Sequence, residues 1–312
     1  MDRSAPRHPS DGAAVKGTIE TREIITLDAG GISLCCTYHR CQGDVPDFSL
    51  GRNQNNRIGV LILNSGFLPR AASGNSAVYW ADSFATRGYP SFRLDLPGLG
   101  DSPGDLPVQY VDFVHLVDAG HYAPLLCTVT KSLTERFNLL GVVVMGLCAG
   151  AVSAIYAAAA STQVKGLVLM APYFHLQLES TDRHAVHAHM RNLCDRLKYF
   201  GRRVLKNKLP RNANLPLIRC WNRVVSAGVP MLVLTATTPR PGLGEFDYLL
   251  QPTAQRSRRI IVKCIERTDH SFVKAPGKEA ARTHIEEWLA DCFPSAEDVA
   301  NGRRRTRVAL KS

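Results

Sequence analysis

The stretch that most constrains this chain is VVVMGLCAGAVSAIYAAAA, residues 142–160. Its β-branched start is typical of a buried strand, and its run of alanines is typical of a helix. Only the short turn from Gly146 to Gly150 separates the two patterns. A strand that passes so directly into a helix predicts a parallel sheet covered by helices.

Strand-like and helix-like segments alternate along the rest of the chain, which supports the same interpretation. With 312 residues, of which 45% are hydrophobic, the chain can bury one large core or two smaller ones. We expect an opening hairpin over 21–40, further strands within 57–66, 91–96, 139–145, 164–174, 229–237 and 258–266, and helices around 77–84, 109–138 and 278–292. The expected fold class is α/β, with a core formed by residues 21–174 and 223–294.

Residues 175–222 interrupt the alternation between two expected core strands. From His175 to Arg223 there are 11 Lys or Arg residues against three acids, a net charge of +8. No strand pattern occurs there, so we interpret the segment as a basic helical insertion. Ligands of open parallel sheets bind beyond the carboxyl ends of the strands, where this insertion would form a lid.

The net charge of +11 does not predict a nucleic-acid-binding protein, because the charge is concentrated in two places. Residues 175–223 contribute +8 and the tail from Arg303 contributes +5, which leaves −2 for the rest. We expect disorder in residues 1–20 and a basic tail over 295–312. We also expect no membrane span and a cytoplasmic location, since no long apolar run or signal-like start is seen.

Cys148 occupies the centre of the turn G-L-C-A-G. A turn of this kind strains its central residue and projects the side chain above the sheet edge. The backbone N–H of Ala149, at the helix start, would point toward the same space and stabilise an anion there. A helix N-terminus and a neighbouring His both favour the thiolate form of a cysteine, so we interpret Cys148 as a nucleophile. The alternative is a small buried residue at the end of a strand.

From Ile58 to Phe293 the chain resembles the α/β-hydrolase superfamily, through the motifs LNSGF, RLDLPGLGDSPG, GLCAG and TDHSF. In detail it is similar to a small group of bacterial hydrolases associated with exosortase systems and secondary metabolism, some of which carry Cys in the elbow. The resemblance implies an α/β-hydrolase fold and makes His270, in TDHSF, the catalytic base. Dienelactone hydrolases share the elbow Cys, but their flanking sequence is less similar.

The third member of the triad is where this chain departs from the superfamily pattern. The resemblance places an acid a few residues after the strand within 229–237, but Thr237, Thr238 and Pro239 stand there. The first carboxylates that follow are Glu245 and Asp247. We expect Glu245 to complete the triad and keep Asp247 as the alternative; both acids could instead simply open a helix, where negative charge is favourable.

The resemblance also implies an oxyanion hole made by the N–H groups of Ala149 and of Phe67, which follows Ser65-Gly66. Asp95 and Asp101 lie in a Gly/Pro-rich loop, where Asp binds backbone amides, so we expect both to be structural. His184, His187 and His189 lack the spacing and partners of a metal site, and no nucleotide-binding loop is present. We expect neither a metal nor a cofactor.

These features together predict an acyl-transfer enzyme: a thioesterase, esterase or acyltransferase with a Cys-His-acid triad and a covalent acyl-thioester on Cys148. The basic insertion suits a small-molecule acyl substrate with an acidic carrier, such as a carrier-protein or coenzyme A thioester. The alternative is a catalytically silent scaffold that binds a small molecule or a protein, which the missing acid after residue 237 favours.

Overall fold

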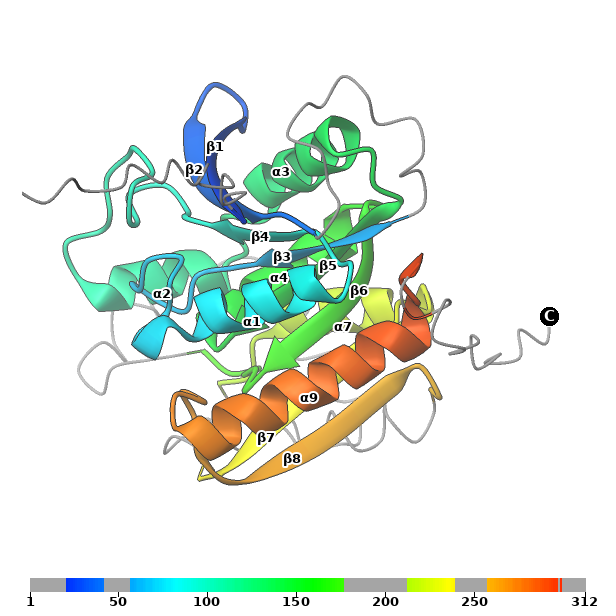
Figure 1. Ribbon diagram of the computed structural model, residues 1–312. Coiled ribbons are helices and arrows are strands. Elements are labelled where there is room, and N and C mark those ends of the chain that lie inside the picture. Colours follow the sequence, from blue (N-terminus) through cyan, green and yellow to red (C-terminus); the bar gives the residue numbers. More distant parts are fainter. Residues whose placement is uncertain (1–20, 42–56, 177–211, 239–256, 297, 299–312) are drawn as a thin grey trace, which may run out of the picture.

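Eight strands form one sheet in the computed structural model, which describes residues 21–41, 57–176, 212–238, 257–296 and 298 (Figure 1). Their order is β1-β2-β4-β3-β5-β6-β7-β8. The expected hairpin of β1 and β2 is antiparallel, β2 is antiparallel to β4, and the pairs from β4 to β8 are all parallel. The strands are β1 (Arg22–Asp28), β2 (Ser33–His39), β3 (Ile58–Ile62), β4 (Ser91–Leu94), β5 (Gly141–Leu147), β6 (Val164–Met170), β7 (Met231–Thr238) and β8 (Ile260–Asp269).

Helices cover both faces of this sheet, as a parallel sheet requires. One face packs against α2 (Tyr110–Asp118), α3 (Ala123–Arg136), α4 (Ala149–Ala160) and α7 (Leu215–Ser226). The other face packs against α1 (Ser76–Thr86), which follows the short η2 (Ser73–Asn75), and α9 (Ala275–Cys292). The predicted α/β-hydrolase fold is thereby confirmed.

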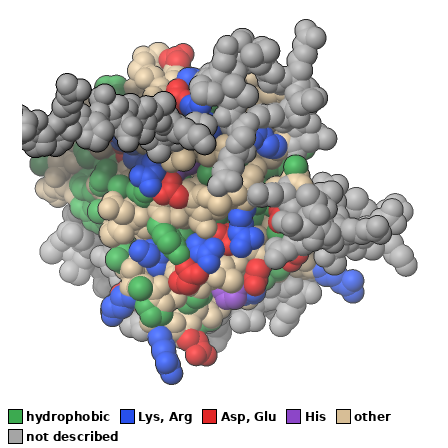
Figure 2. All heavy atoms as spheres, in the orientation of Figure 1, with side chains coloured by type: hydrophobic (Ala, Val, Ile, Leu, Met, Phe, Trp, Pro, Cys, Tyr) green, Lys and Arg blue, Asp and Glu red, His purple; other side chains and the backbone are tan. Residues whose placement is uncertain are grey.

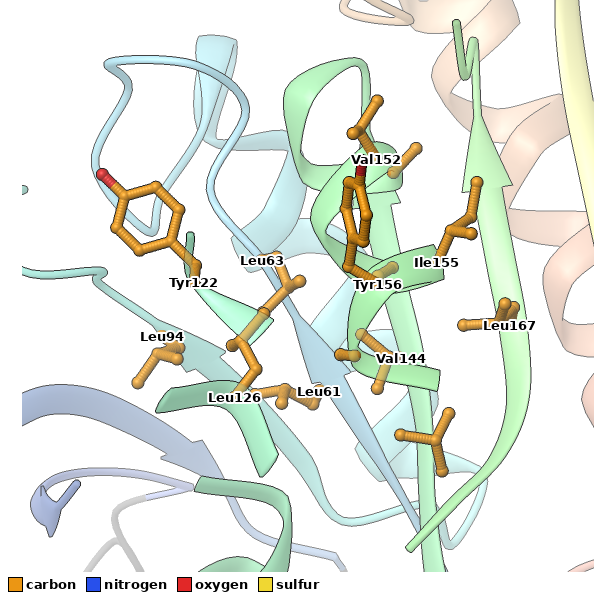
Figure 3. Close-up of a cluster of buried hydrophobic side chains, with 14 of the residues drawn as sticks. Leu61, Leu63, Leu94, Tyr122, Leu126, Val144, Val152, Ile155, Tyr156 and Leu167 are labelled. Atoms are coloured by element: carbon orange, nitrogen blue, oxygen red, sulfur yellow. The ribbon is translucent and has the colours of Figure 1, made fainter. Parts of the chain in front are cut away.

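The two faces of the sheet carry separate hydrophobic clusters. On the larger one, β3 and β5 contribute Leu61 and Val144, which lie beneath Val152 and Ile155 of α4 (Figure 3). All seven residues of β5 are buried, which explains why its sequence is continuously apolar rather than alternating. The strand that leads into the elbow is therefore enclosed on both faces of the sheet.

The helical region expected over residues 109–138 consists of two helices, α2 and α3. The chain turns at Gly120, whose φ is 75° and whose missing Cβ would lie 2.8 Å from a ring carbon of Tyr156. Both the backbone angle and the close ring contact require glycine at this position. The break lets α2 end at Asp118, beside α4 and the start of α7.

The predicted insertion extends too far at its C-terminal boundary. Residues 177–211 lie outside the described residues, but α7 begins at Leu215, within the range assigned to the insertion. Its apolar face packs against α4, and Asn214 caps its N-terminus by accepting a hydrogen bond from the N–H of Leu217 (3.1 Å). The members of that buried face are Leu217, Ile218, Trp221 and Val224.

The expected tail also begins too early, because Ser295 and Asp298 are buried. Tyr89 donates a hydrogen bond to Asp298 Oδ2 (2.7 Å), which also accepts from the N–H (3.0 Å) and Oγ (2.8 Å) of Ser295. The chain after α9 is thus attached to the residue that leads into β4. The predicted N-terminal segment 1–20 and the residues from 299 onward lie outside the described ranges.

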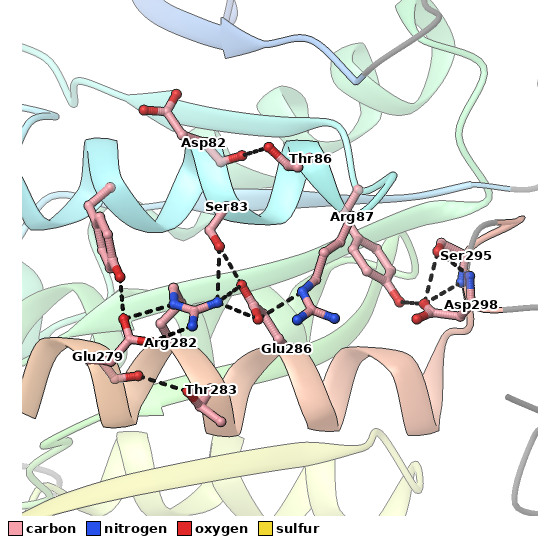
Figure 4. A network of polar contacts seen from close by, with 12 residues as sticks. Asp82, Ser83, Thr86, Arg87, Glu279, Arg282, Thr283, Glu286, Ser295 and Asp298 are labelled. Atoms are coloured by element: carbon pink, nitrogen blue, oxygen red, sulfur yellow. Dashed lines mark hydrogen bonds and ion pairs between the residues drawn. The ribbon is translucent and has the colours of Figure 1, made fainter. Parts of the chain in front are cut away.

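A network of ion pairs and hydrogen bonds joins α1 to α9 on the smaller layer (Figure 4). The carboxylate of Glu286 is almost fully buried and binds Arg282 (2.6 and 2.7 Å) and Arg87 (2.8 Å), and it accepts a hydrogen bond from Ser83 Oγ. On the surface over these helices, positive and negative side chains are interspersed (Figure 2).

None of the helices that the structure describes has the length and apolar character to cross a membrane.

Candidate active site

The predicted elbow is present at the carboxyl end of β5, where α4 begins immediately. Cys148 has a φ of 56° and a ψ of −115°, a backbone conformation that a side-chain-bearing residue rarely adopts. A Cβ on Gly146 would lie 2.2 Å from the carbonyl carbon of Gly150, and a Cβ on Gly150 would lie 2.5 Å from the carbonyl oxygen of Asn64. Both glycines of the motif are therefore required by close backbone contacts.

Cys148 is half-buried and lies where the two hydrophobic clusters meet, since it packs against members of both. Its N–H donates to the carbonyl oxygen of Met170 in β6 (2.9 Å), and its own carbonyl accepts from Ala151 (3.0 Å) and Val152 (3.2 Å) in α4. The residue is thus fixed between a strand and a helix.

Several other cysteines differ from a nucleophile in their surroundings. Burial raises the pKa of five thiols, and it raises the pKa of one of them, Cys292, to about 11. A raised pKa leaves these thiols protonated and unreactive near neutral pH. The remaining four of the five are Cys35, Cys36, Cys127 and Cys220.

His270 follows β8 directly and lies at the same edge of the sheet as Cys148, because β5 through β8 are parallel. Two residues later, Phe272 is fully buried and packs in the cluster that also contains Leu147 of β5. Val273 comes so close to Gly74 of η2 that a Cβ there would meet it at 2.7 Å. The loop after β8 therefore turns back across the carboxyl edge toward the elbow.

Asp269 stabilises this loop. Its Oδ1 accepts hydrogen bonds from the N–H (3.0 Å) and the Oγ (2.5 Å) of Ser271, and these bonds hold the pKa of the carboxyl below its usual range. Thr238, the last residue of β7, pairs with Asp269 in the sheet. The chain thus leaves β7 beside the residue that precedes His270. Glu245 and Asp247, the predicted acid and its alternative, lie outside the described residues.

The two expected oxyanion donors belong to segments that the structure brings together at the elbow. Ala149 is the first residue of α4, so its N–H has no acceptor within the helix. Phe67 lies in a turn closed by a hydrogen bond from the N–H of Leu68 to the carbonyl of Ser65 (3.3 Å). The Phe67 ring packs edge-on against Tyr110 and Phe113, with centroid distances of 5.2 and 4.8 Å.

The structural role expected for Asp95 and Asp101 agrees with their contacts. Asp95 is fully buried and accepts hydrogen bonds from the N–H groups of Arg70 (2.6 Å) and Asp101 (3.2 Å). Asp101 is largely exposed and pairs with Arg70 at 2.7 Å. Asn64 also donates to Asp95. The sequence did not single out Arg70 or Asn64, because each binds residues that are far away in the chain.

Tyr173 is a second group near the elbow that the sequence did not reveal. Its side chain is buried just after β6, near the Asp118 carboxylate. Burial above all, and then the negative charge of Asp118, raise the pKa of Tyr173. The phenol therefore stays neutral beside the thiol. The sequence feature that could have identified it is its position three residues after β6, which ends at the same edge of the sheet as the elbow.

The part of the chain that the structure describes contains no group of three or more His, Cys, Asp or Glu side chains arranged for a metal ion. His184, His187 and His189, for which the sequence predicts no metal site, lie outside that part.

Comparison with known families and structures gives consistent results. The profile of the family described as serine aminopeptidase, S33, matches residues 58–214. The structure of DcsB in complex with its substrate analogue superimposes with a TM-score of 0.58 at 13% identity, over 87% of this chain and 99% of that chain. The Pyrococcus furiosus esterase Pf2001 gives 0.55 at 13% identity, over 87% and 93% of the two chains.

A third similar structure is Est1E from Butyrivibrio proteoclasticus with bound ferulic acid. Its TM-score is 0.53 at 14% identity, and the match covers 85% of this chain and 99% of that chain. A comparison with curated proteins found no match. At these identities the similar structures show a shared fold.

Proposed function

Because this chain belongs to the serine aminopeptidase S33 family of α/β-hydrolases, we propose that it is an acyl-transfer enzyme, a thioesterase, esterase or acyltransferase, that forms an acyl-thioester on Cys148. The family name refers to serine, whereas the elbow of this chain carries cysteine. The observation that carries the proposal is the strained backbone of Cys148, held between close-packed glycines at the N-terminus of α4. Strain of this kind is retained where it presents a reactive side chain.

In the proposed reaction, His270 takes the proton of the Cys148 thiol and the sulfur adds to the carbonyl carbon of the substrate. The carbonyl π electrons move to oxygen, and the N–H groups of Ala149 and Phe67 stabilise that oxyanion. When the carbonyl re-forms, the bond to the leaving group breaks and the His270 imidazolium gives the leaving group its proton. The product of this half-reaction is an acyl-thioester on Cys148.

The second half-reaction returns the thiol. A water, alcohol, amine or thiol loses its proton to His270 and attacks the thioester carbonyl. The bond to the Cys148 sulfur then breaks, and the His270 imidazolium returns the proton to that sulfur. Glu245 would orient His270, with Asp247 as the alternative. A thiolate depends less on the orienting acid than a hydroxyl does, so a weak third member is compatible with activity.

For the acyl donor, we propose a small-molecule acyl substrate or an acyl group carried as a carrier-protein or coenzyme A thioester. Support comes from the net charge of +8 between residues 175 and 223, which would attract phosphates. Two of the similar structures, an esterase and a complex with ferulic acid, agree with an acyl substrate for this fold. A catalytically silent scaffold is the second candidate, favoured by Thr237 and Thr238 in place of an acid.

Alkylation of cysteines distinguishes these two candidates. On brief treatment with iodoacetamide, read by peptide mass spectrometry, we expect Cys148 to react before the other cysteines. Cys264, which is exposed, is the matched reference thiol within the same molecule. Substitution His270→Gln should slow the alkylation of Cys148 and leave that of Cys264 unchanged, because only Cys148 would depend on the imidazole.

Activity measurements complete the test. With p-nitrophenyl butyrate or butyryl coenzyme A, native protein should gain a butyryl group on Cys148, and Cys148→Ala should lose at least about a thousandfold in rate. Cys148→Ser should retain part of the activity, because the family uses serine at this position. If Cys148 alkylates no faster than Cys264 and acquires no acyl group, the protein is a binding scaffold.

A further inference from the structure

A cluster of three side chains, the buried Asn64 and Asp95 and the partly buried Arg70, lies behind the loop that carries Phe67. We call it the loop-holding cluster. Asn64 is 3% exposed and follows β3 by two residues. Its amide nitrogen donates to the carbonyl oxygen of Leu68 (2.9 Å) and to Asp95 Oδ1 (3.1 Å), and its amide oxygen accepts from the N–H of Leu96 (2.8 Å). Every polar atom of this side chain is therefore used.

Asp95 fixes the other end of the same loop. Its Oδ1 accepts from the N–H of Arg70 (2.6 Å), and its Oδ2 pairs with the Arg70 guanidinium. The guanidinium also donates to Thr37 Oγ1 in β2 (2.8 Å), so it is tied to the sheet. Between Asn64 and Arg70, the loop is thus held at the Leu68 carbonyl and the Arg70 N–H, and Phe67 lies within that span.

The loop-holding cluster is also in direct contact with the elbow. The backbone carbonyl of Asn64 touches the first turn of α4 at Gly150, where there is no space for even a methyl group. Asn64 therefore connects two segments, the elbow that carries the N–H of Ala149 and the loop that carries the N–H of Phe67. An oxyanion hole needs these two donors at a fixed separation, because each must lie about 3 Å from one developing charge.

We infer that Asn64 and Asp95 are positioning residues for acyl transfer, which hold the Phe67 N–H toward the space above Cys148. This inference rests on the proposed function and extends it to residues that touch neither the substrate nor Cys148. A buried carboxylate and a buried amide are costly to place in a core, since every polar atom of each must find a hydrogen-bond partner. Apart from the bond that Asp95 accepts from the N–H of Asp101, their side-chain hydrogen bonds go to this loop, to each other or to Leu96, which is where a positioning role would place them.

The test compares Asp95→Asn and Asn64→Ala with native protein. We expect kcat for p-nitrophenyl butyrate to fall about 10-fold to 100-fold in each variant, with KM within twofold, because the loop donor acts on the oxyanion and not on the bound ester. Butanal should bind more weakly by a similar factor, since the thiolate adds to it to form a hemithioacetal oxyanion. The rate of Cys148 alkylation by iodoacetamide should not change, because that reaction forms no oxyanion.

Tyr89→Phe is the matched control. It removes a buried hydrogen bond to Asp298 near the amino end of β4, at the opposite edge of the sheet. It should lower the thermal unfolding temperature and leave kcat unchanged. Asp95→Asn keeps the shape of the side chain, so it remains informative if Asn64→Ala does not fold.

The possible results separate the two proposals. If native protein gains no butyryl group on Cys148 from either ester, the proposed function is overturned and the positioning role with it. If native protein is acylated but both variants keep native kcat and butanal affinity, the positioning role alone is wrong. Equal losses of kcat in Tyr89→Phe and Asp95→Asn would also overturn it, since they would reflect general destabilisation.

Discussion

Gly150 tolerates substitution poorly, because a methyl group there would lie 2.5 Å from the backbone carbonyl oxygen of Asn64, which cannot move aside freely. We expect Gly150→Ala to push α4 away from Asn64 and so to separate the two oxyanion donors. A displacement of about 1 Å costs on the order of 100-fold in rate, and overpacking costs about 1–3 kcal/mol of stability. Steady-state kinetics and urea unfolding measure both effects.

Gly59→Ala is the control for this prediction. Gly59 is also buried in β3, but its Cβ would meet the flexible end of the Leu139 side chain at 2.7 Å. That side chain can rotate, and Gly59 lies near the amino end of β3, away from the elbow. This variant should lose some stability and keep its rate. Equal rates in the two variants would contradict the role given to Gly150.

At this scale, the sequence predicted residues whose chemistry is visible in a local motif. The strained turn around Cys148 could be predicted because glycine spacing and the change of pattern both occur within one short stretch. Asn64, Arg70 and Tyr173 could not be found in this way. Asn64 bonds to residues up to 32 positions away and Arg70 to residues up to 33 positions away, and Tyr173 reaches Asp118 across the core. Only the folded chain brings such partners together.

At the scale of elements, the Glu286 network stabilises the packing of α1 against α9. Glu286→Gln keeps the side-chain shape but removes the charge that binds Arg282 and Arg87. We expect the free energy of unfolding to fall by about 1–3 kcal/mol, since the carboxylate is buried while its partners are partly exposed. Chemical denaturation provides the measurement.

Glu279 provides the comparison within the same helix. It binds Arg282 and Tyr79 at the surface, and the Arg282 hydrogen bond lowers its pKa to about 2. Solvent screens an exposed pair, so Glu279→Gln should change stability far less than Glu286→Gln. A larger loss from the Glu279 variant would mean that burial does not set the strength of this network.

The hydrophobic pattern predicted which segments are strands and which are helices. It did not predict the C-terminal end of the insertion or the start of the tail. The segment before residue 222 was expected to be polar because its charges are conspicuous, yet α7 carries a buried stripe among its arginines. Ser295 and Asp298 look like the start of a polar tail, yet they are buried against Tyr89. In both cases a few long-range contacts outweigh the average polarity of the segment.

At the scale of the whole molecule, His39 makes the stability of the fold dependent on pH. It lies in β2 and is almost fully buried; Nε2 accepts from Arg93 Nε (2.7 Å), so Nδ1 carries the hydrogen and donates to Asp82 (2.7 Å). Burial first, and then the charge of Arg93, lower the pKa of His39 to about 4. In the unfolded chain the pKa would be about 6.5.

The unfolded chain therefore binds a proton between pH 6.5 and 4 that the folded protein does not bind. Stability from this residue is complete above pH 6.5 and falls as the pH drops toward 4, by at most about 3 kcal/mol. Urea unfolding at several pH values measures the slope, which should be shallower in His39→Gln. An exposed residue, His121, supplies the control substitution His121→Gln. An unchanged slope in the His39 variant would contradict this account.

The open sheet has one more consequence, which concerns other copies of the same chain. Among the described strands, β1 and β8 are outermost, and an outer strand can accept a strand from another molecule. Both strands carry charged side chains along their length, Arg22, Glu23 and Asp28 in the first and Lys263, Glu266, Arg267 and Asp269 in the last. Stacking copies edge to edge would desolvate these charges, which disfavours growth into fibres at high concentration.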